Sequence, residues 1–84
     1  MRRDRDIEFT YEVEMRTSGD NYYATVATEE AAAEKLFDFR EEAVEFGEEI
    51  WEETITEIET EYGEDPDSGP FSEKTERIWY HKKY

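Results

Sequence analysis

Residues 7–16 alternate strictly between apolar and polar side chains, and this pattern constrains the fold more than any other. Ile7, Phe9, Tyr11, Val13 and Met15 occupy the odd positions, and charged or hydroxyl side chains occupy the even ones. A period of two over ten residues, with β-branched and aromatic types, predicts a strand with one buried face. A second layer of the protein must therefore cover that face.

A turn and a second strand follow this run. Residues 17–21 contain Gly19 and Asn21, which tolerate the positive φ angles of a tight turn. The next residues, 22–27, place Tyr22, Ala24 and Val26 on one side of an extended segment. Residues 5–28 are therefore predicted to form a β-hairpin.

The segment 29–62 reads as an acidic helix. It is rich in Ala and Glu, it contains no proline, and Thr28 before it suits an N-cap. Gly63 is a natural helix terminator, whereas Gly47 lies within the segment and is expected to kink or split the helix. We expect one long helix over 29–62, either continuous or kinked at Gly47.

The remainder of the chain predicts an acidic turn over 63–70 and a strand over 74–84. The helix would return the chain so that this last strand lies beside the first one. The expected fold is a single α+β domain over residues 1–84. It has two layers in the order ββαβ, with a three-stranded antiparallel sheet of order 2-1-3 covered by the helix.

The charge of the chain is concentrated in one segment. The chain has 84 residues and a formal net charge of −15. Residues 29–67 contain seventeen acidic residues and two basic ones, Lys35 and Arg40, whereas the charges of the two flanks together cancel. A one-sided electric field has different consequences from uniform acidity, because it favours one orientation of a charged partner.

On the predicted helix, apolar residues gather on one side and carboxylates on the other, at about 100° per residue. Arg40 projects toward the apolar side. Few lysines interrupt the acidic row, although each like-charge pair four residues apart costs about 0.2–0.5 kcal/mol. The predicted partner-binding carboxylates are Glu34, Asp38, Glu41, Glu42, Glu45, Glu48, Glu49, Glu52, Glu53 and Glu59.

Neighbouring carboxylates on such a helix stand about 5–6 Å apart, a spacing comparable with that of successive phosphates along a nucleic-acid strand. We interpret the row as a mimic of a nucleic-acid backbone. Its expected partner is a basic nucleic-acid-binding protein, such as a nuclease or a CRISPR effector complex. Direct binding to nucleic acid or to an anionic membrane is not expected, because like charges repel.

Three other interpretations stay open. The row is the ordinary solvated face of a helix, the domain is a protein interaction module or homodimer that binds through aromatic side chains, or the chain is adapted to high salt. Salt adaptation should spread acids over every surface, which the neutral flanks do not show. The candidate aromatic anchors are Phe37, Trp51 and Trp79.

No enzymatic chemistry is expected. Cysteine is absent, so thiol nucleophiles and disulfides are excluded, and His81 is the single histidine. The run from Asp65 to Gly69, with Glu76 further on, fails as a calcium loop because Pro70 stands where glycine is required. We expect no catalytic residue, no metal, no cofactor and no membrane span, and a cytoplasmic location.

The small size, the acidity and the order of a hairpin followed by an acidic helix resemble small DNA-mimicking inhibitors from phages and mobile elements. These include anti-CRISPR and anti-restriction proteins. The string from Asn21-Tyr22-Tyr23 to Glu34-Lys35-Leu36-Phe37 resembles the strand-to-helix junction of one anti-CRISPR family. That family plugs the site where a CRISPR nuclease recognises the motif beside its target. The resemblance implies inhibition by steric and electrostatic occlusion, in the cytoplasm of a host cell.

Overall fold

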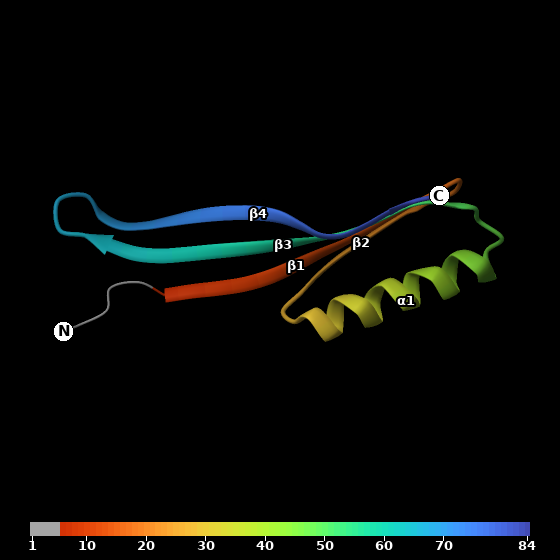
Figure 1. Ribbon diagram of the computed structural model, residues 1–84, viewed down its shortest axis with the longest axis horizontal. Helices are drawn as coiled ribbons and strands as arrows, with labels where there is room; N and C mark the ends of the chain where they lie inside the picture. Colours follow the sequence, from red (N-terminus) through yellow and green to blue (C-terminus); the bar gives the residue numbers. More distant parts are fainter. Residues whose placement is uncertain (1–5) are drawn as a thin grey trace.

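The computed structural model describes residues 6–84 as a four-stranded antiparallel sheet with one helix (Figure 1). Residue 5, the predicted start of the hairpin, lies outside the described residues. The strands follow the spatial order β2-β1-β3-β4. In chain order the elements are β1 (Asp6–Thr17), β2 (Asn21–Val26), α1 (Glu29–Glu45), β3 (Ile50–Asp65) and β4 (Gly69–Lys83).

The predicted hairpin is confirmed. Strands β1 and β2 pair antiparallel, with Tyr11 opposite Val26 and Met15 opposite Tyr22. The odd residues of β1 share one face, on which Tyr11, Val13 and Met15 are buried, whereas Ile7 and Phe9 at the start of the strand are exposed and not buried as expected. The period of two in the sequence therefore identifies both the strand and its buried face.

The predicted start of the helix is also confirmed, but its predicted end is wrong. The Thr28 hydroxyl accepts a hydrogen bond of 3.1 Å from the backbone N–H of Ala31, as an N-cap does. The helix ends at Glu45, and Gly47 follows it with a φ of 70°. The N–H of Glu48 then donates to the carbonyl oxygen of Ala43 at 2.8 Å. The chain therefore leaves the helix at Gly47 and never resumes it, because glycine adopts this left-handed conformation without steric cost.

Residues 50–62, expected to be helical, form most of strand β3. Thr54, Ile55, Thr56, Ile58 and Thr60 are β-branched and stand between the glutamates of this segment. β-Branched side chains lose rotamer freedom in a helix and pack well on a pleated strand. Burial of this strand between β1 and β4 then outweighs the helix preference of its glutamates.

The predicted three-stranded ββαβ fold is therefore wrong, and the order of elements is ββαββ. The central strand β3 pairs antiparallel with β1 on one side and with β4 on the other. The C-terminal strand lies beside β3, at the edge of the sheet, and not beside β1 as expected. The acidic turn over 66–68 thus closes a β-hairpin instead of joining a helix to a strand.

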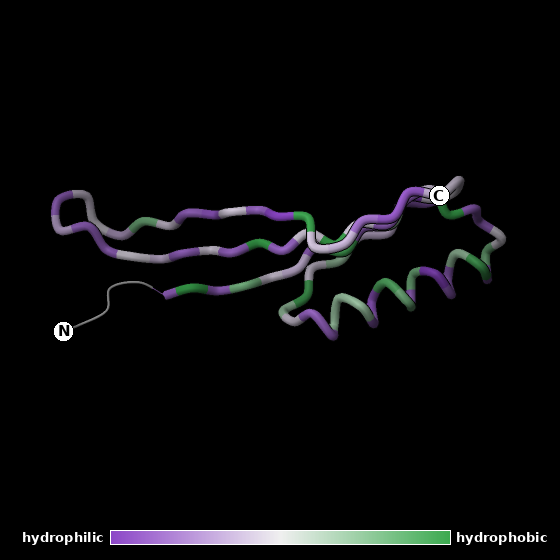
Figure 2. Tube along the Cα trace, viewed as in Figure 1, coloured by the Kyte–Doolittle hydropathy of each residue, from purple (hydrophilic) through white to green (hydrophobic). Residues whose placement is uncertain are grey.

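The helix covers only one half of a long sheet. Ala32, Leu36 and Phe39 pack on Val13 and Ile55 to form the core. The molecule measures 55 × 21 × 17 Å, and the far half of β1, β3 and β4 extends beyond the helix (Figure 1). Figure 2 shows hydrophilic and apolar residues alternating along the start of β1, whereas the far parts of β3 and β4 are mainly hydrophilic. Within residues 6–84, no helix combines the length and the apolar character that a membrane span requires.

Substitutions at Gly47 test whether its left-handed conformation ends the helix. The substitution Gly47→Ala should lower the free energy of unfolding by about 1–2 kcal/mol, because a Cβ atom is disfavoured in the left-handed conformation. Gly47→Asn should cost less, since asparagine adopts that conformation more readily. Urea denaturation of both variants measures the difference. If alanine were as stable as glycine, the left-handed turn would not be what ends the helix.

Candidate partner-binding face

The outward side of α1 carries a row of carboxylates that we call the acidic stripe. At about 100° per residue, this row is centred opposite the buried side of the helix. The buried side consists of Ala32, Leu36, Phe39 and Ala43. All members of the row are exposed and follow one another at intervals of three or four residues. They are Glu30, Glu34, Asp38, Glu41 and Glu45.

The acidic stripe is electrostatically uncompensated. It extends for about 22 Å at 1.5 Å per residue, with about 5–6 Å between neighbours. Within residues 6–84, none of its five carboxylates forms an ion pair or a side-chain hydrogen bond. Lys35 lies half-buried at the border of the row, and Arg40 is engaged elsewhere. The stripe therefore presents its full charge to solvent.

Arg40 reaches under the helix to Glu53 of strand β3, whose side chain is completely buried. The guanidinium donates through Nε and Nη2 to the two carboxylate oxygens, each at 2.7 Å. The hydroxyls of Tyr84 and Tyr80 donate to the same carboxylate at 2.6 and 3.2 Å. Burial by itself raises the pKa of Glu53, but the hydrogen bonds from Arg40 and Tyr84 outweigh it and lower that pKa below its usual value. Glu53 is therefore a charged structural residue.

The other acids at the centre of β3 are also paired. Arg77 donates to Glu57 at 2.6 Å, and the Tyr11 hydroxyl donates to the same carboxylate at 3.0 Å. Glu52 bonds His81 at 2.6 Å and Arg16 at 3.1 Å. These contacts lower the pKa values of both glutamates. The sheet thus pairs the glutamates at the centre of β3 with basic side chains.

The structure divides the ten predicted partner-binding carboxylates among three elements. The expectation of one continuous row on one helix is wrong, because the helix is half as long as predicted. Glu30 belongs to the exposed row but was missed by the prediction. Five of the ten lie exposed on α1, and they are Glu34, Asp38, Glu41, Glu42 and Glu45. Two lie in the connection between α1 and β3, and they are Glu48 and Glu49. Three lie on β3, and they are Glu52, Glu53 and Glu59.

Glu48 holds the β1–β2 turn rather than facing outward. Its carboxylate accepts hydrogen bonds from the Tyr22 hydroxyl at 2.5 Å and from the Asp20 N–H at 3.2 Å. This contact, together with burial, raises the pKa of Tyr22 to about 12. The carboxylate lies so close to Gly19 that a Cβ atom there would clash with its Oε2. Glu48 is therefore a structural contact of the hairpin.

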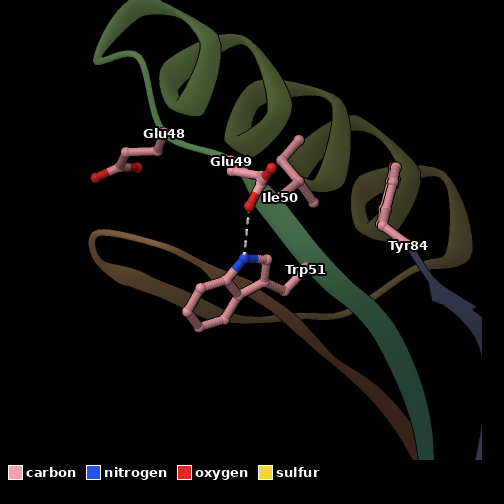
Figure 3. Close-up of a pocket in the computed structure, with 5 residues that line it drawn as sticks. All are labelled: Glu48, Glu49, Ile50, Trp51 and Tyr84. Carbon is pink, nitrogen blue, oxygen red and sulfur yellow. Dashed lines mark hydrogen bonds between the residues drawn. The ribbon is translucent and has the colours of Figure 1, made fainter.

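The three candidate aromatic anchors lie on different elements and form no common patch. Phe37, on α1, borders the acidic stripe and is 56% exposed. Trp51 lies at the start of β3 beside a hollow of about 510 Å³, which Glu49 and Tyr84 also line (Figure 3). Its indole N–H donates to Glu49 at 3.1 Å. Trp79 packs edge-on against Tyr11, with 6.1 Å between ring centroids.

The sequence does not predict the cluster around Glu53, but it contains one signal of it. Arg40 lies on the apolar side of the helix, where a cation needs a buried partner. Nothing in the sequence identified that partner, since Glu53 was itself assigned to the same helix. Only the pairing of β3 with β4 brings Glu53 together with Tyr80 and Tyr84.

The described residues contain no grouping of histidine, aspartate and glutamate that could hold a metal ion. Comparison of the chain with protein-family models, with curated proteins and with solved structures finds no match to any of them. The acidic stripe is thus the candidate site on physical grounds alone.

The Arg40–Glu53 pair can be tested by its pH dependence. Arg40→Met should lower the free energy of unfolding by about 3–5 kcal/mol at pH 7, because a buried carboxylate loses its cation. Burial then raises the pKa of Glu53, so the deficit should shrink as the pH falls and the carboxyl group becomes protonated. Urea denaturation at pH 7 and at pH 4 measures this change.

Lys35→Met removes the same charge from the same helix and serves as the control, with an expected change within about 0.5 kcal/mol. Equal losses for the two variants, or a deficit for Arg40→Met that does not change with pH, would contradict the assigned role of Arg40.

Proposed function

We propose that this protein is a nucleic-acid-mimicking inhibitor that occludes the basic DNA- or RNA-binding surface of a target protein. The targets we favour are a CRISPR effector or a restriction enzyme in the cytoplasm of a host cell. The observation that carries the proposal is the unpaired acidic stripe on the outward side of α1. The proposed partner-binding residues are therefore limited to the exposed carboxylates of the helix. Glu52 and Glu53, which lie on β3, are no longer among them.

A row of fixed carboxylates resembles a phosphate backbone in two physical respects. It offers a basic groove several negative charges at regular spacing, and it steers the groove onto itself over long distances. Because α1 is anchored to the sheet by its apolar side and by Arg40, the row is ordered before binding. Little conformational entropy is then lost on association.

The contrast between the helix and the sheet supports this choice of surface. Where the protein needs its acids for folding, it pairs them with Arg16, Arg40, Arg77 or His81. Within residues 6–84, the five carboxylates of the acidic stripe have no such partner, although repulsion between carboxylates four residues apart destabilises a helix. A helix selected only for solubility would interleave lysines. Inhibition by such a surface is stoichiometric and involves no catalytic turnover.

A second candidate function is a protein interaction module without mimicry. Phe37 and Val44 lie exposed along one border of the stripe, 56% and 74% accessible respectively. An apolar border of this kind suits a protein partner, since aromatic side chains contribute strongly to protein interfaces. In that case Phe37→Ala should weaken binding more than charge reversal does, and added salt should have little effect.

Charge reversal of the stripe tests the proposal. The assay is displacement of fluorescent duplex DNA from purified restriction enzymes and DNA-binding CRISPR effectors. The parent protein should displace DNA from at least one of them, and a fourfold charge-reversed variant should lose about a hundredfold or more in potency. The variant replaces Glu34, Asp38, Glu41 and Glu45 with lysine.

A matched control reverses four exposed acids outside the helix and has the same net charge. It replaces Asp6, Glu14, Glu64 and Asp67 with lysine. The control should keep most of its potency, and the potency of the parent should fall steeply between low and physiological salt. The proposal is overturned if the two variants lose potency equally, or if the parent displaces DNA from none of the proteins.

A further inference from the structure

The outer edge of β4 is a second surface that the acidic stripe does not explain. This strand lies last in the sheet, and its outer side pairs with no strand within residues 6–84. It is 15 residues long, whereas the opposite edge strand β2 has six residues. Residues 72–79 are all exposed. A long, free strand edge presents unpaired N–H and C=O groups that readily pair with another strand.

The segment between Phe71 and Ile78 is regular and open to pairing. Pro70 precedes it, and the register shift opposite Ile55 and Thr56 follows it at Trp79. Between these two points, successive residues of β4 pair one-to-one with β3. Their side chains therefore alternate between the two faces of the sheet, with Glu73, Thr75 and Arg77 on the face of Ile55 and Lys74 and Glu76 on the other.

The charges of this segment complement those of the same segment in a second copy that runs antiparallel to it. When two copies run antiparallel with Thr75 opposite Thr75, Glu73 of each copy lies opposite Arg77 of the other. On the other face, Lys74 lies opposite Glu76. Every charged residue from 73 to 77 then meets an opposite charge directly across the strands, and such cross-strand pairs stabilise a sheet.

Neighbouring registers lack this property. In a continuous sheet, each face of one copy adjoins the same face of the other, as a twofold axis perpendicular to the sheet requires. Each residue then lies opposite a residue of the same face, so the axis passes midway between the two copies of one residue. Centring the pairing on Lys74 places two lysines opposite each other, and centring it on Glu76 places two glutamates opposite each other. Like charges directly opposite destabilise a sheet. The charge order therefore selects one register.

We propose that two copies of this chain associate through β4, centred on Thr75, to form a continuous eight-stranded sheet. Charged side chains ordinarily protect a strand edge by repelling a like copy, but here their order makes two copies attract. Strand β4 also suits this role because its basic residues outnumber its acidic ones in a strongly acidic protein. Arg77 already donates to Glu57 from one nitrogen, and its guanidinium retains N–H groups for Glu73 of the second copy.

Charge-swap variants on the face away from the helix test the register. Lys74 and Glu76 form no ion pair with another residue in the part of the chain that the structure describes, so changing them spares the fold. We expect a dimer in sedimentation velocity over a concentration series. Lys74→Glu and Glu76→Lys should each weaken it about tenfold, because each places like charges opposite. The double variant should restore it.

This set separates the register from general charge repulsion. Lys74→Glu makes the chain more acidic and Glu76→Lys makes it less acidic, so general repulsion would move the dissociation constant in opposite directions. The proposed register requires both single variants to weaken the dimer. Opposite effects, or failure of the double variant to recover, would overturn the proposal, as would a parent that stays monomeric at every concentration.

A crosslink gives an independent measurement. The chain has no cysteine, so Thr75→Cys introduces one thiol per copy. Residues directly opposite in an antiparallel pair have Cα atoms about 4.5–5.5 Å apart, within the range of about 4.4–6.8 Å that a disulfide spans. Oxidised Thr75→Cys should therefore run as a covalent dimer on a non-reducing gel.

Ser72→Cys is the matched control, because its two thiols would lie about 20 Å apart in this register. Equal crosslinking of both variants would indicate random collision and would contradict the proposal. None of these measurements involves the acidic stripe or a target protein, so their outcome is independent of the proposed inhibitory function.

Discussion

The bidentate contact between Arg40 and the buried Glu53 is the interaction on which the rest of the structure depends. It joins the helix to the central strand, and through Tyr80 and Tyr84 it also joins both to the edge strand. A buried carboxylate tolerates no loose geometry, because each unpaired oxygen would carry a large desolvation cost. The contact therefore fixes the rotation of α1 about its axis. It also engages the one arginine of the helix, so that within residues 6–84 no cation pairs with the outward carboxylates.

The acidity of the chain thus has two different physical roles. In the sheet, Glu52, Glu53 and Glu57 belong to ion pairs between strands or between the helix and a strand, and their lowered pKa values mean that they stabilise the fold as anions. On the outward side of the helix, the carboxylates of the acidic stripe repel one another, and within residues 6–84 none of them has an ion-pair partner. The net charge of −15 conceals this division, since it counts both kinds equally. Exposed acids also lie on the strands and turns, but those of the acidic stripe form one row on one side of one element.

Local signals predicted the parts of the fold that depend on local chemistry. The alternation over 7–16 identified β1 with its buried face, and Thr28 identified the start of the helix. The segment 50–62 was mistaken because its glutamates favour a helix, while Ile55 and Thr56 favour a strand, and only pairing with β1 and β4 decides between them. Because of that error, Glu52, Glu53 and Glu59 were predicted to lie on the acidic side of the helix. The exposed row from Glu34 to Glu45 was found correctly, because it depends on helical periodicity alone.

The sheet extends well beyond the helix, and this has a consequence for how the molecule moves. The covered half holds the apolar core, whereas the far ends of β3 and β4 are half-buried or exposed and rely more on their ladder of hydrogen bonds. Free energies of local opening follow buried contacts, so the two halves should open as separate cooperative units. The hairpin tip then exchanges its amide hydrogens long before the core does. The boundary between the two units is expected near Trp79, where the register between β3 and β4 shifts.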